Sequence, residues 1–465
     1  MGRQGDLEMS ELKHVVSKTE RDKQVVEAVV RRYGPLSRID IHKLTHLQPS
    51  AISRLTRRLL SEGWLIESGR AENPTGRKPV LLRFNDEHAF LVGVGFNTEN
   101  VVAAVMNLHP EIRASVTEPT CLHKGTEGLV YQLLGCVQKV MLEARADPGS
   151  VLGIGVAGSG LVNTRTGTLI MSSTLDFLKN VPLQQIFEKE FGVSTLIENI
   201  TRAKTVAESV LGAGEGRDDV IYIEYGAGIG AGIMIGGRVL YGSGYAAGEF
   251  GHTHVMDEGP ACKCGSFGCL EALVGCAALE AKIRKVVAEG GYSQASKLAN
   301  GDVNKISGWM VLEAAARLRD KTCLAIVEQV GKYLGLGLAN LVNLFNPSIV
   351  VLDQRLNLAG DGLLDQVVKV VRRQALSHAT DDLLIRFGKL GSCSAVLGMG
   401  LMLLERRFQI PSLKPPRFMI EPQAVPVRLG QAPTKAGAAS KPNNGRPQSG
   451  SPDSELTLAV GVGHE

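Results

Sequence analysis

The sequence has no long apolar segment and few cysteines. No uninterrupted apolar run approaches the roughly 20 residues that a membrane-spanning helix needs. Residues 1–18 are charged where a secretory signal would be apolar. The 8 cysteines in 465 residues are too few and too unevenly spaced for a disulfide framework. We therefore expect a cytoplasmic protein with no membrane partner.

The composition supports a folded, multidomain chain whose charge is unevenly distributed. With 44% hydrophobic and 21% charged residues, a chain of this length is expected to form two or three domains. Residues 21–84 contain 13 Lys and Arg against 6 Asp and Glu, a balance of +7, whereas the remainder carries 38 against 41, or −3. A basic module of this kind suits DNA, although a solvated charged face gives the same count.

The basic module has the pattern of a winged helix-turn-helix. Apolar residues at helical spacing predict a helix over Arg21–Arg32, and Ser37 can cap a second, short helix. A third helix starts at Ser50, and the segments Trp64–Glu67 and Val80–Phe84 read as the two strands of a hairpin. We assign residues 20–86 to this domain and residues 1–19 to a flexible N-terminus.

The third helix and the tip of the hairpin are the parts that this geometry presents to a duplex. The candidate DNA-binding residues are Ser50, Ser53, Arg54, Arg57, Arg77 and Lys78. Arg54 is the best candidate for a bidentate contact with guanine in the major groove. The alternative is that the winged helix is a protein-docking module and that these basic residues are merely solvated.

Residues 87–410 alternate short aliphatic strands with longer helical segments, which predicts a mixed α/β domain. The segment after this domain, residues 411–465, is rich in Pro, Gly, Ala, Ser and Gln and is predicted to be disordered. The expected elements include strands at 90–96, 151–156, 220–223 and 349–352, and helices at 323–345, 363–374 and 397–407.

Three cysteines and a histidine form a candidate metal site. Cys262, Cys264 and Cys269 lie within eight residues, among glycines that allow tight turns, and His252 lies ten residues upstream. A tetrahedral Cys3His zinc site needs this ligand set, and four protein ligands would make the Zn2+ structural. His254 is a possible substitute ligand, and three reduced thiols in a loop are the alternative.

Two groups of residues carry a family resemblance. The first comprises Gly248–His252, Cys262–Gly265 and Gly268–Glu271, and the second comprises Pro35–Arg38 and Gly76–Pro79. The first group resembles the signature of the ROK family, which contains repressors and sugar kinases, and the second resembles the DNA-binding half of its repressor branch. The resemblance spans roughly residues 20–410. It implies an α/β fold with a winged helix-turn-helix followed by a two-lobed, actin-like ATPase domain.

The resemblance also implies an effector site in the cleft between the lobes. The positions that contact sugar hydroxyls in family members match Asn199, Glu249, His252 and Glu271. Carboxylates and an imidazole can bind several hydroxyls at once, which makes these roles chemically sensible. The alternative for Glu249 and Glu271 is support of the zinc-binding loop.

Several kinase positions are altered. Family kinases have an acidic residue after the asparagine of a Glu-Asn-Asp motif, where this chain has Ile200, which cannot accept a proton. Glu99, in the first phosphate loop, would meet phosphates with the wrong charge. Ala227 replaces a hydroxyl in the second loop, and Asp353-Gln354 replaces paired glycines at the adenosine site. We therefore expect no kinase activity.

The altered positions also weaken the expectation of sugar binding. The aspartate replaced by Ile200 contacts sugar in family kinases, and Thr174 stands where another sugar-contacting asparagine is expected. Arg202 is an unusual cation near the cleft, where it either favours an anionic ligand such as a sugar phosphate or points to solvent.

The sequence thus favours a transcriptional repressor of carbohydrate metabolism, controlled by a sugar or sugar-phosphate effector. The expected partner is an inverted-repeat DNA operator, bound by a homodimer or a tetramer. Two alternatives stay open: a ROK sugar kinase with a DNA-binding head, and a ligand-independent DNA-binding scaffold.

Overall fold

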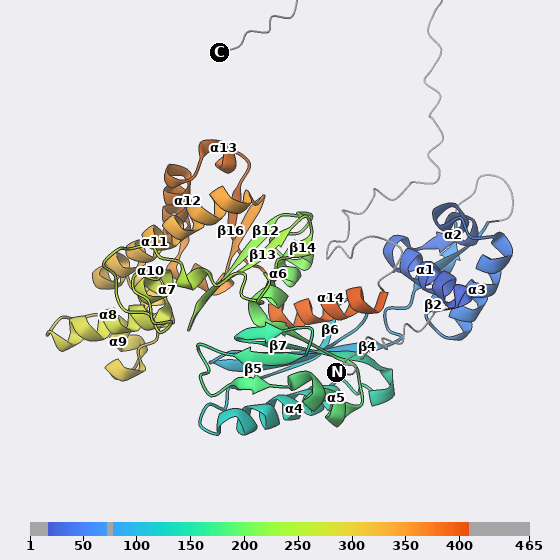
Figure 1. Cartoon of the computed structure of the whole chain (residues 1–465), viewed down its shortest axis with the longest axis horizontal. Coiled ribbons are helices and arrows are strands. Elements are labelled where there is room, and N and C mark those ends of the chain that lie inside the picture. The colour runs from blue at the N-terminus through green and yellow to red at the C-terminus, as the bar shows by residue number, and fades with distance from the viewer. Residues whose placement is uncertain (1–16, 72–77, 409–465) are drawn as a thin grey trace, which may run out of the picture.

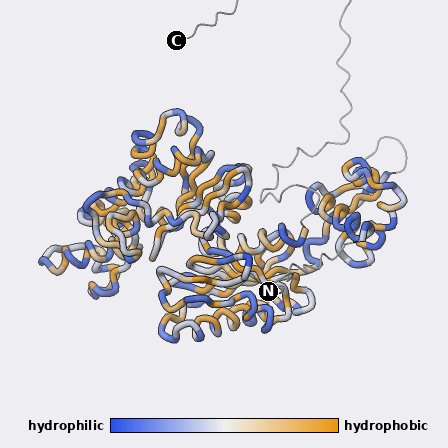
Figure 2. Tube along the Cα trace, in the orientation of Figure 1, coloured by the Kyte–Doolittle hydropathy of each residue, from blue (hydrophilic) through white to orange (hydrophobic). Residues whose placement is uncertain are grey.

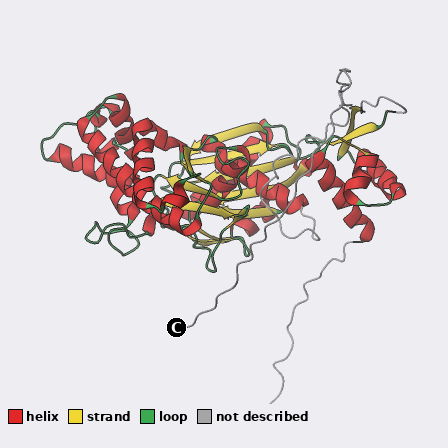
Figure 3. Ribbon diagram, turned by 90° about the horizontal axis from the view of Figure 1, so that it is seen from above, coloured by secondary structure: helices red, strands yellow, loops and turns green. Residues whose placement is uncertain are grey.

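The computed structural model describes residues 17–71 and 78–408, which form a small N-terminal head and two α/β lobes (Figure 1). In Figure 3 the strands occupy the middle of the molecule, with the head at one end and a group of helices at the other. Within the described residues no helix is long and apolar enough to cross a membrane.

The head contains three helices and a three-stranded sheet. Its elements are α1 (Lys18–Tyr33), β1 (Leu36–Ser37), α2 (Arg38–Thr45), α3 (Pro49–Ser61), β2 (Leu65–Arg70) and β3 (Val80–Phe84). Ser37 begins α2 with a capping box, because its hydroxyl accepts from the backbone of Asp40 while the Asp40 carboxylate accepts from the backbone of Ser37. Pro49 occupies the first turn of α3, where a missing N–H costs nothing. The sheet order is β1-β3-β2, with β3 antiparallel to both neighbours.

Lobe I is built on a five-stranded sheet in the order β11-β7-β4-β5-β6. Its strands are β4 (Phe90–Phe96), β5 (Asn100–Met106), β6 (Ile112–Pro119), β7 (Val151–Gly158) and β11 (Thr195–Asn199), with helices α4 (Gly125–Glu143) and α5 (Leu183–Phe191). The first strand, β4, is antiparallel to β5 and parallel to β7. A small antiparallel sheet of β8 (Leu161–Asn163), β9 (Thr168–Met171) and β10 (Lys179–Val181) is inserted between β7 and α5.

Lobe II repeats the strand order of lobe I. Its sheet runs β14-β13-β12-β15-β16, so that in both lobes the third, second, first, fourth and fifth strands follow one another. The strands are β12 (Val220–Tyr225), β13 (Ile229–Ile235), β14 (Arg238–Val239), β15 (Ile349–Leu352) and β16 (Leu384–Phe387). The helices are α7 (Leu270–Val274), α8 (Cys276–Ala288), α9 (Ala295–Leu298), α10 (Gly308–Arg317), α11 (Lys321–Phe345), α12 (Asp361–Gln374) and α13 (Ser377–Thr380). The repeated order is the mark of a duplicated two-lobed fold.

Two helices join the lobes. Helix α6 (Ile200–Leu211) packs on the lobe II sheet, α14 (Ser394–Phe408) packs on the lobe I sheet, and the two helices pack against each other (Figure 1). Gly398 makes the closest approach, because a Cβ at this position would lie 1.8 Å from the carbonyl oxygen of Ala203. The contact between α6 and α14 therefore requires glycine at position 398.

The hydrophobic residues concentrate along the strands and on the inward faces of the helices (Figure 2). Separate clusters fill the two lobes, while a third runs without interruption from the head into lobe I. That third cluster joins Leu55 and Leu59 of α3 to Leu91 of β4 and Leu403 of α14. Apolar packing therefore fixes the head against the rest of the chain.

Candidate functional site

The four candidate effector residues line one cavity between the lobes. Asn199, Glu249, His252 and Glu271 border a cavity of about 100 Å³, together with residues of the β4–β5 turn and of η4 (Gln354–Ala359). Asn199 comes from the end of the lobe I sheet, and the other three come from lobe II. Residues far apart in the sequence thus meet at the cleft between the lobes.

Asn199 begins α6. Its side-chain oxygen accepts from the backbone N–H groups of Thr201 at 2.9 Å and Arg202 at 3.2 Å, and its amide nitrogen donates to the carbonyl of Gly160 at 2.8 Å. A side chain that reaches the cavity is therefore also the N-cap of the helix that joins the lobes. Any ligand that contacts Asn199 would act directly on the start of α6.

Glu271 and Glu249 differ in how firmly they are held. One carboxylate oxygen of Glu271 accepts from the backbone N–H of Ile229 at 2.8 Å, which ties α7 to the start of β13. Glu249 has a side chain that is 53% exposed, and its Oε2 lies 3.9 Å from Nε2 of His252. Glu249 therefore keeps its carboxylate available, whereas Glu271 also has a structural task.

His252, Cys262, Cys264 and Cys269 form a compact cluster of metal-ligating atoms. Their ligand atoms all lie within 4.8 Å of one another. His252 is the last residue of η2 (Phe250–His252), which Glu249 precedes. Its Nδ1 lies 3.5 Å from Sγ of Cys262, and its Nε2 faces the carboxylate of Glu249. Cys269 immediately precedes α7. This cluster can hold a metal ion, and the loop of the cluster is continuous with the helix that carries Glu271.

His254 lies outside this cluster. Its Nδ1 is 2.8 Å from the carbonyl oxygen of Phe267, and its Nε2 is 3.7 Å from Asp257. The structure thus places His252, and not His254, with the three cysteines.

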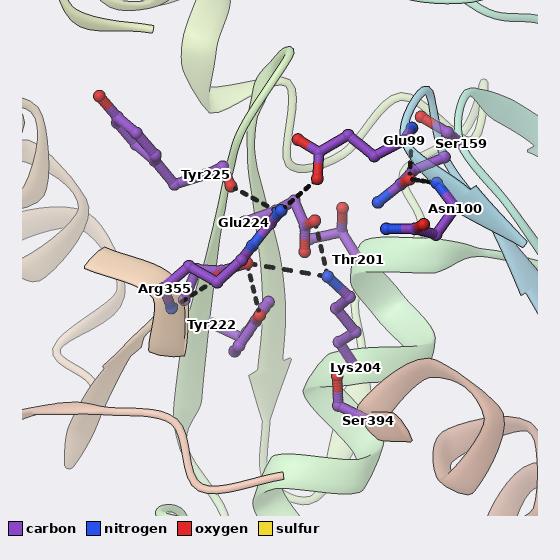
Figure 4. Close-up of polar contacts among 12 residues, drawn as sticks. Glu99, Asn100, Ser159, Thr201, Lys204, Tyr222, Glu224, Tyr225, Arg355 and Ser394 are labelled. Atoms are coloured by element: carbon purple, nitrogen blue, oxygen red, sulfur yellow. Dashed lines mark hydrogen bonds and ion pairs between the residues drawn. The ribbon is translucent and has the colours of Figure 1, made fainter. Parts of the chain in front are cut away.

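A charged network crosses the cleft beside the cavity (Figure 4). Glu99 of the β4–β5 turn binds Arg355 of η4, with 2.6 Å between Oε2 and Nη1. Lys204 of α6 lies 2.7 Å from Glu224 of β12 and 3.7 Å from Asp353. Burial opposes the charge of Lys204, but the Glu224 and Asp353 carboxylates hold the pKa of this ammonium above its ordinary value. Glu99, expected from the sequence to face phosphates, is thus paired with a cation of the opposite lobe.

The sequence interpretation of Arg202 is wrong. Arg202 is only 3% exposed, donates from Nη1 to Glu198 at 3.0 Å, and lies over the ring of Tyr241 at 5.1 Å. Its other terminal nitrogen donates to the carbonyl of Tyr245. The guanidinium neither points to solvent nor faces the cavity, because Glu198 and two tyrosines from a distant loop enclose it.

The cavity also contains polar residues that the sequence interpretation missed. Ser159 lies 3.3 Å from the hydroxyl of Thr174, and both line the cavity with Asn97 and Thr201. Thr174, which stands where the sequence analysis expects a sugar-contacting asparagine, thus lines the cavity. Ser159 follows a buried strand between two glycines, a signal that could have marked it.

The head exposes one face of α3. Ser50, Ser53, Arg54 and Arg57 are exposed, whereas Ile52, Leu55 and Leu59 on the opposite face are buried. Within the described residues Arg54 and Arg57 have no acidic partner, while the neighbouring Arg58 is held by Glu62 at 2.7 Å. Lys78 is exposed at the end of the hairpin, and Arg77 lies outside the described residues.

The head meets α14 through an aromatic cluster. The ring of Phe408, at the end of α14, lies 5.4 Å from that of Phe84 and 6.1 Å from that of Trp64, edge-on to both. The Arg31 guanidinium covers Phe408 at 5.0 Å. The helix that packs against α6 therefore ends inside the base of the head.

Residues 91–406 match the family model described as ROK family. The chain belongs to the ROK family. This membership accounts for the duplicated lobes.

Among curated ROK relatives, the xylose repressor of Caldicellulosiruptor bescii is 29% identical over 81% of this chain and 93% of its own length. The DNA-binding transcriptional dual regulator NagC of Escherichia coli is 27% identical over 81% of this chain and 91% of its own. Both matches are longer than the family region, so they include residues outside the two lobes.

Two solved structures of the family, a regulator and a kinase, cover different shares of this chain. A ROK family transcriptional regulator, a homologue of the E. coli MLC protein, has a TM-score of 0.71 at 26% identity and covers 84% of this chain and 96% of its own. A ROK family glucokinase from Streptomyces griseus, in complex with glucose and AMPPNP, has a TM-score of 0.60 at 27% identity. It covers 68% of this chain and 99% of its own. The likeness to the regulator extends over more of the chain than the likeness to the kinase.

Proposed function

We propose that this protein is a sugar-responsive, DNA-binding transcriptional regulator that represses genes of carbohydrate metabolism. The observation that carries the proposal is that one chain combines a basic helical head with a ROK body. Relatives named as a repressor or as transcriptional regulators align over both parts. The coverage of the S. griseus glucokinase is smaller and fits the body alone.

The effector in this proposal is a sugar or a sugar phosphate bound in the cavity between the lobes. Glu249 offers an exposed carboxylate, and His252, Glu271 and Asn199 offer further groups within the same cavity. Such groups bind several hydroxyls at once. The relative from C. bescii is named as a xylose repressor, which supports a sugar as the ligand class.

Kinase activity is not part of the proposal. Ile200, at the position of the family's acidic residue, lines the cavity, and no carboxylate replaces it in the sequence motif. Glu99, in the position of a phosphate loop, already binds Arg355 across the cleft. A nucleotide phosphate bound at this loop would lie beside that carboxylate, and the two negative charges would repel each other.

Structural Zn2+ in the His252 and cysteine cluster is the second part of the proposal. A tetrahedral zinc with Zn–S bonds of about 2.3 Å and Zn–N bonds of about 2.0 Å separates two sulfurs by about 3.8 Å, and a sulfur from a nitrogen by about 3.5 Å. The observed distances are 3.7 Å between Cys264 and Cys269 and 3.5 Å between Cys262 and His252. Zinc would then fix the loop that carries Glu249 and leads into Glu271.

The head supplies the DNA contacts in this proposal. The exposed Ser50, Ser53, Arg54 and Arg57 of α3 would enter the major groove, and Lys78 would contact the duplex from the wing. Arg77, which lies outside the described residues, is assigned to the wing from the sequence alone. A homodimer presents two such heads, which suits an inverted-repeat operator. We assign base recognition to the guanidinium of Arg54, which is exposed and has no acidic partner within residues 17–71 and 78–408.

The effector signal travels through α6 and α14 in our proposal. Asn199 starts α6 at the cavity, Gly398 brings α14 into contact with α6, and Phe408 ends α14 within the head. A change in the angle between the lobes would therefore move the head and change the spacing between the two heads of a dimer.

The experiment that tests the effector site is a thermal-shift screen of the zinc-loaded protein with neutral sugars, amino sugars and their phosphates. We expect one compound class to stabilise the protein and Glu249→Ala to abolish that stabilisation. Lys263→Ala, an exposed substitution in the same loop, is the matched control and should leave it intact. The hit is then added to a DNA fragment selected from a random library, with binding followed by fluorescence anisotropy. A hit that leaves DNA affinity unchanged would contradict a sensor role.

A further inference from the structure

One carboxylate of lobe I is bound by two donors of lobe II. Oε2 of Glu99 accepts from Nη1 of Arg355 at 2.6 Å, and Oε1 accepts from the indole N–H of Trp309 at 2.8 Å. Glu99 stands in the turn between β4 and β5, while Arg355 lies in η4 and Trp309 in α10. Each carboxylate oxygen therefore has its own partner on the far side of the cleft.

The two donors are held in place by their own lobe. The Arg355 guanidinium lies over the Trp309 ring at 4.0 Å and donates to the carbonyl of Tyr225 at 3.3 Å. Its Nε is 3.5 Å from Asp353. The Trp309 ring in turn stands edge-on to the buried ring of Tyr225 at 5.8 Å. The receptor for the carboxylate is therefore preorganised.

The turn that carries Glu99 is equally well anchored in lobe I. The side-chain oxygen of Asn97 accepts from the backbone N–H groups of Glu99 and Asn100, each at 2.9 Å. The backbone carbonyl of Glu99 accepts from Thr120 at 3.0 Å, just beyond β6. A contact between two fixed groups on different lobes cannot persist unless the lobes keep their present distance.

This contact differs from the other charged bridge in the cleft. Lys204 and Glu224 link α6 to lobe II within the buried region, with side chains only 9% and 13% exposed. The side chains of Glu99 and Arg355 are 36% and 34% exposed, and both line the cavity of the candidate effector residues. The Lys204–Glu224 pair is thus buried, and the Glu99–Arg355 pair is accessible; both are drawn in Figure 4.

We propose that Glu99, Arg355 and Trp309 form a latch that holds the two lobes closed and sets the balance between closed and open arrangements of the cleft. The latch lets the closed arrangement form without a ligand that bridges the lobes. The latch consists of charge-assisted hydrogen bonds whose side chains are about one third exposed. Loss of the latch should therefore lower the ratio of closed to open molecules about tenfold.

The latch contains its own optical reporter. The sequence has 2 tryptophans, Trp64 in the head and Trp309 in the latch. A Trp64→Phe background therefore leaves Trp309 as the single tryptophan, whose emission can be excited selectively. In that background we expect Glu99→Gln to increase acrylamide quenching of Trp309 and to increase the radius of gyration measured by small-angle X-ray scattering. Glu99→Ala, which removes both acceptors, should increase both quantities further.

Two further variants keep the test decisive. Glu118→Gln removes a carboxylate of similar exposure that pairs with Lys139 within lobe I, so it should change neither quantity. Trp309→Phe keeps the aromatic face for Arg355 but removes the N–H donor, and it should raise the radius of gyration in the otherwise unaltered chain. Unchanged scattering in Glu99→Ala and Trp309→Phe would overturn the latch, even if quenching changed, because a local rearrangement alone would then explain the fluorescence.

Discussion

The substitution Phe408→Ala tests whether α14 holds the head. Phe408 packs edge-on against Phe84 and Trp64 and lies beneath the Arg31 guanidinium. Each aromatic pair contributes about 0.5–1.5 kcal/mol beyond area burial, and the cation–π contact contributes about 0.5–1 kcal/mol. Because the ring is half-buried, we expect the loss of docking free energy to be about 2–3 kcal/mol.

This loss should free the head without unfolding it. Val26, Ile41 and Leu59 stay buried within the head itself, so DNA affinity should persist while the response to an effector is lost. In differential scanning calorimetry we expect one transition for the parent protein and two for Phe408→Ala. Hydrogen exchange should become faster at the end of α14. Tyr131→Ala, at a side chain on α4 that is 81% exposed, is the control and should change neither measurement. A single transition at the parent temperature in Phe408→Ala would refute the role of this contact.

Three further substitutions follow from the site and from the joining helices. Cys264→Ser should lower the bound zinc measured by mass spectrometry to below one ion per chain and lower the melting temperature, because one of four ligands is lost; Cys121→Ser should do neither. Arg54→Ala should weaken binding to a selected operator by about 1–3 kcal/mol and relax its sequence preference in an anisotropy titration, whereas Arg58→Ala, whose guanidinium Glu62 already holds, should weaken it far less. Gly398→Ala should destabilise the body by at least about 1–3 kcal/mol in chemical denaturation, because the new methyl meets the Ala203 carbonyl; equal stability would show that α6 and α14 can move apart at little cost.

Elements with local signals could be predicted closely from the sequence. The strand predicted at 349–352 coincides with β15, and the helix predicted at 323–345 is α11, which begins at Lys321 because Asp320 caps it. The spacing of apolar residues along a strand or a helix indicates which side of that element is buried. This spacing can be read from residues that are close together in the sequence. The cysteine spacing likewise placed three thiols on one loop, and the structure brings His252 to them.

Contacts between distant segments could not be predicted. Arg202 was interpreted from its neighbourhood in the sequence as a cation of the cleft, but Tyr241 and Tyr245 enclose it from a loop some forty residues away. Glu99 was compared only with a phosphate loop, since nothing in the sequence links it to Arg355, 256 residues later. Contacts of this kind depend on how the chain folds in three dimensions, including how the two lobes are oriented. The spacing of residues within one helix or strand carries no information on that arrangement.

The contacts of Arg202 and Glu99 change how the cleft is understood. If Arg202 were free, the cavity would offer a cation to a ligand; its pairing with Glu198 removes that charge. Arg355 is the cation that does border the cavity, and Glu99 already binds it. A neutral sugar can therefore enter without displacing Glu99 from Arg355, whereas a sugar phosphate that reached Arg355 would have to displace Glu99 and so release the contact between the lobes. A neutral sugar should thus leave the latch in place, and a sugar phosphate should release it. The Trp309 emission of the Trp64→Phe protein distinguishes the two ligand classes with no knowledge of the operator.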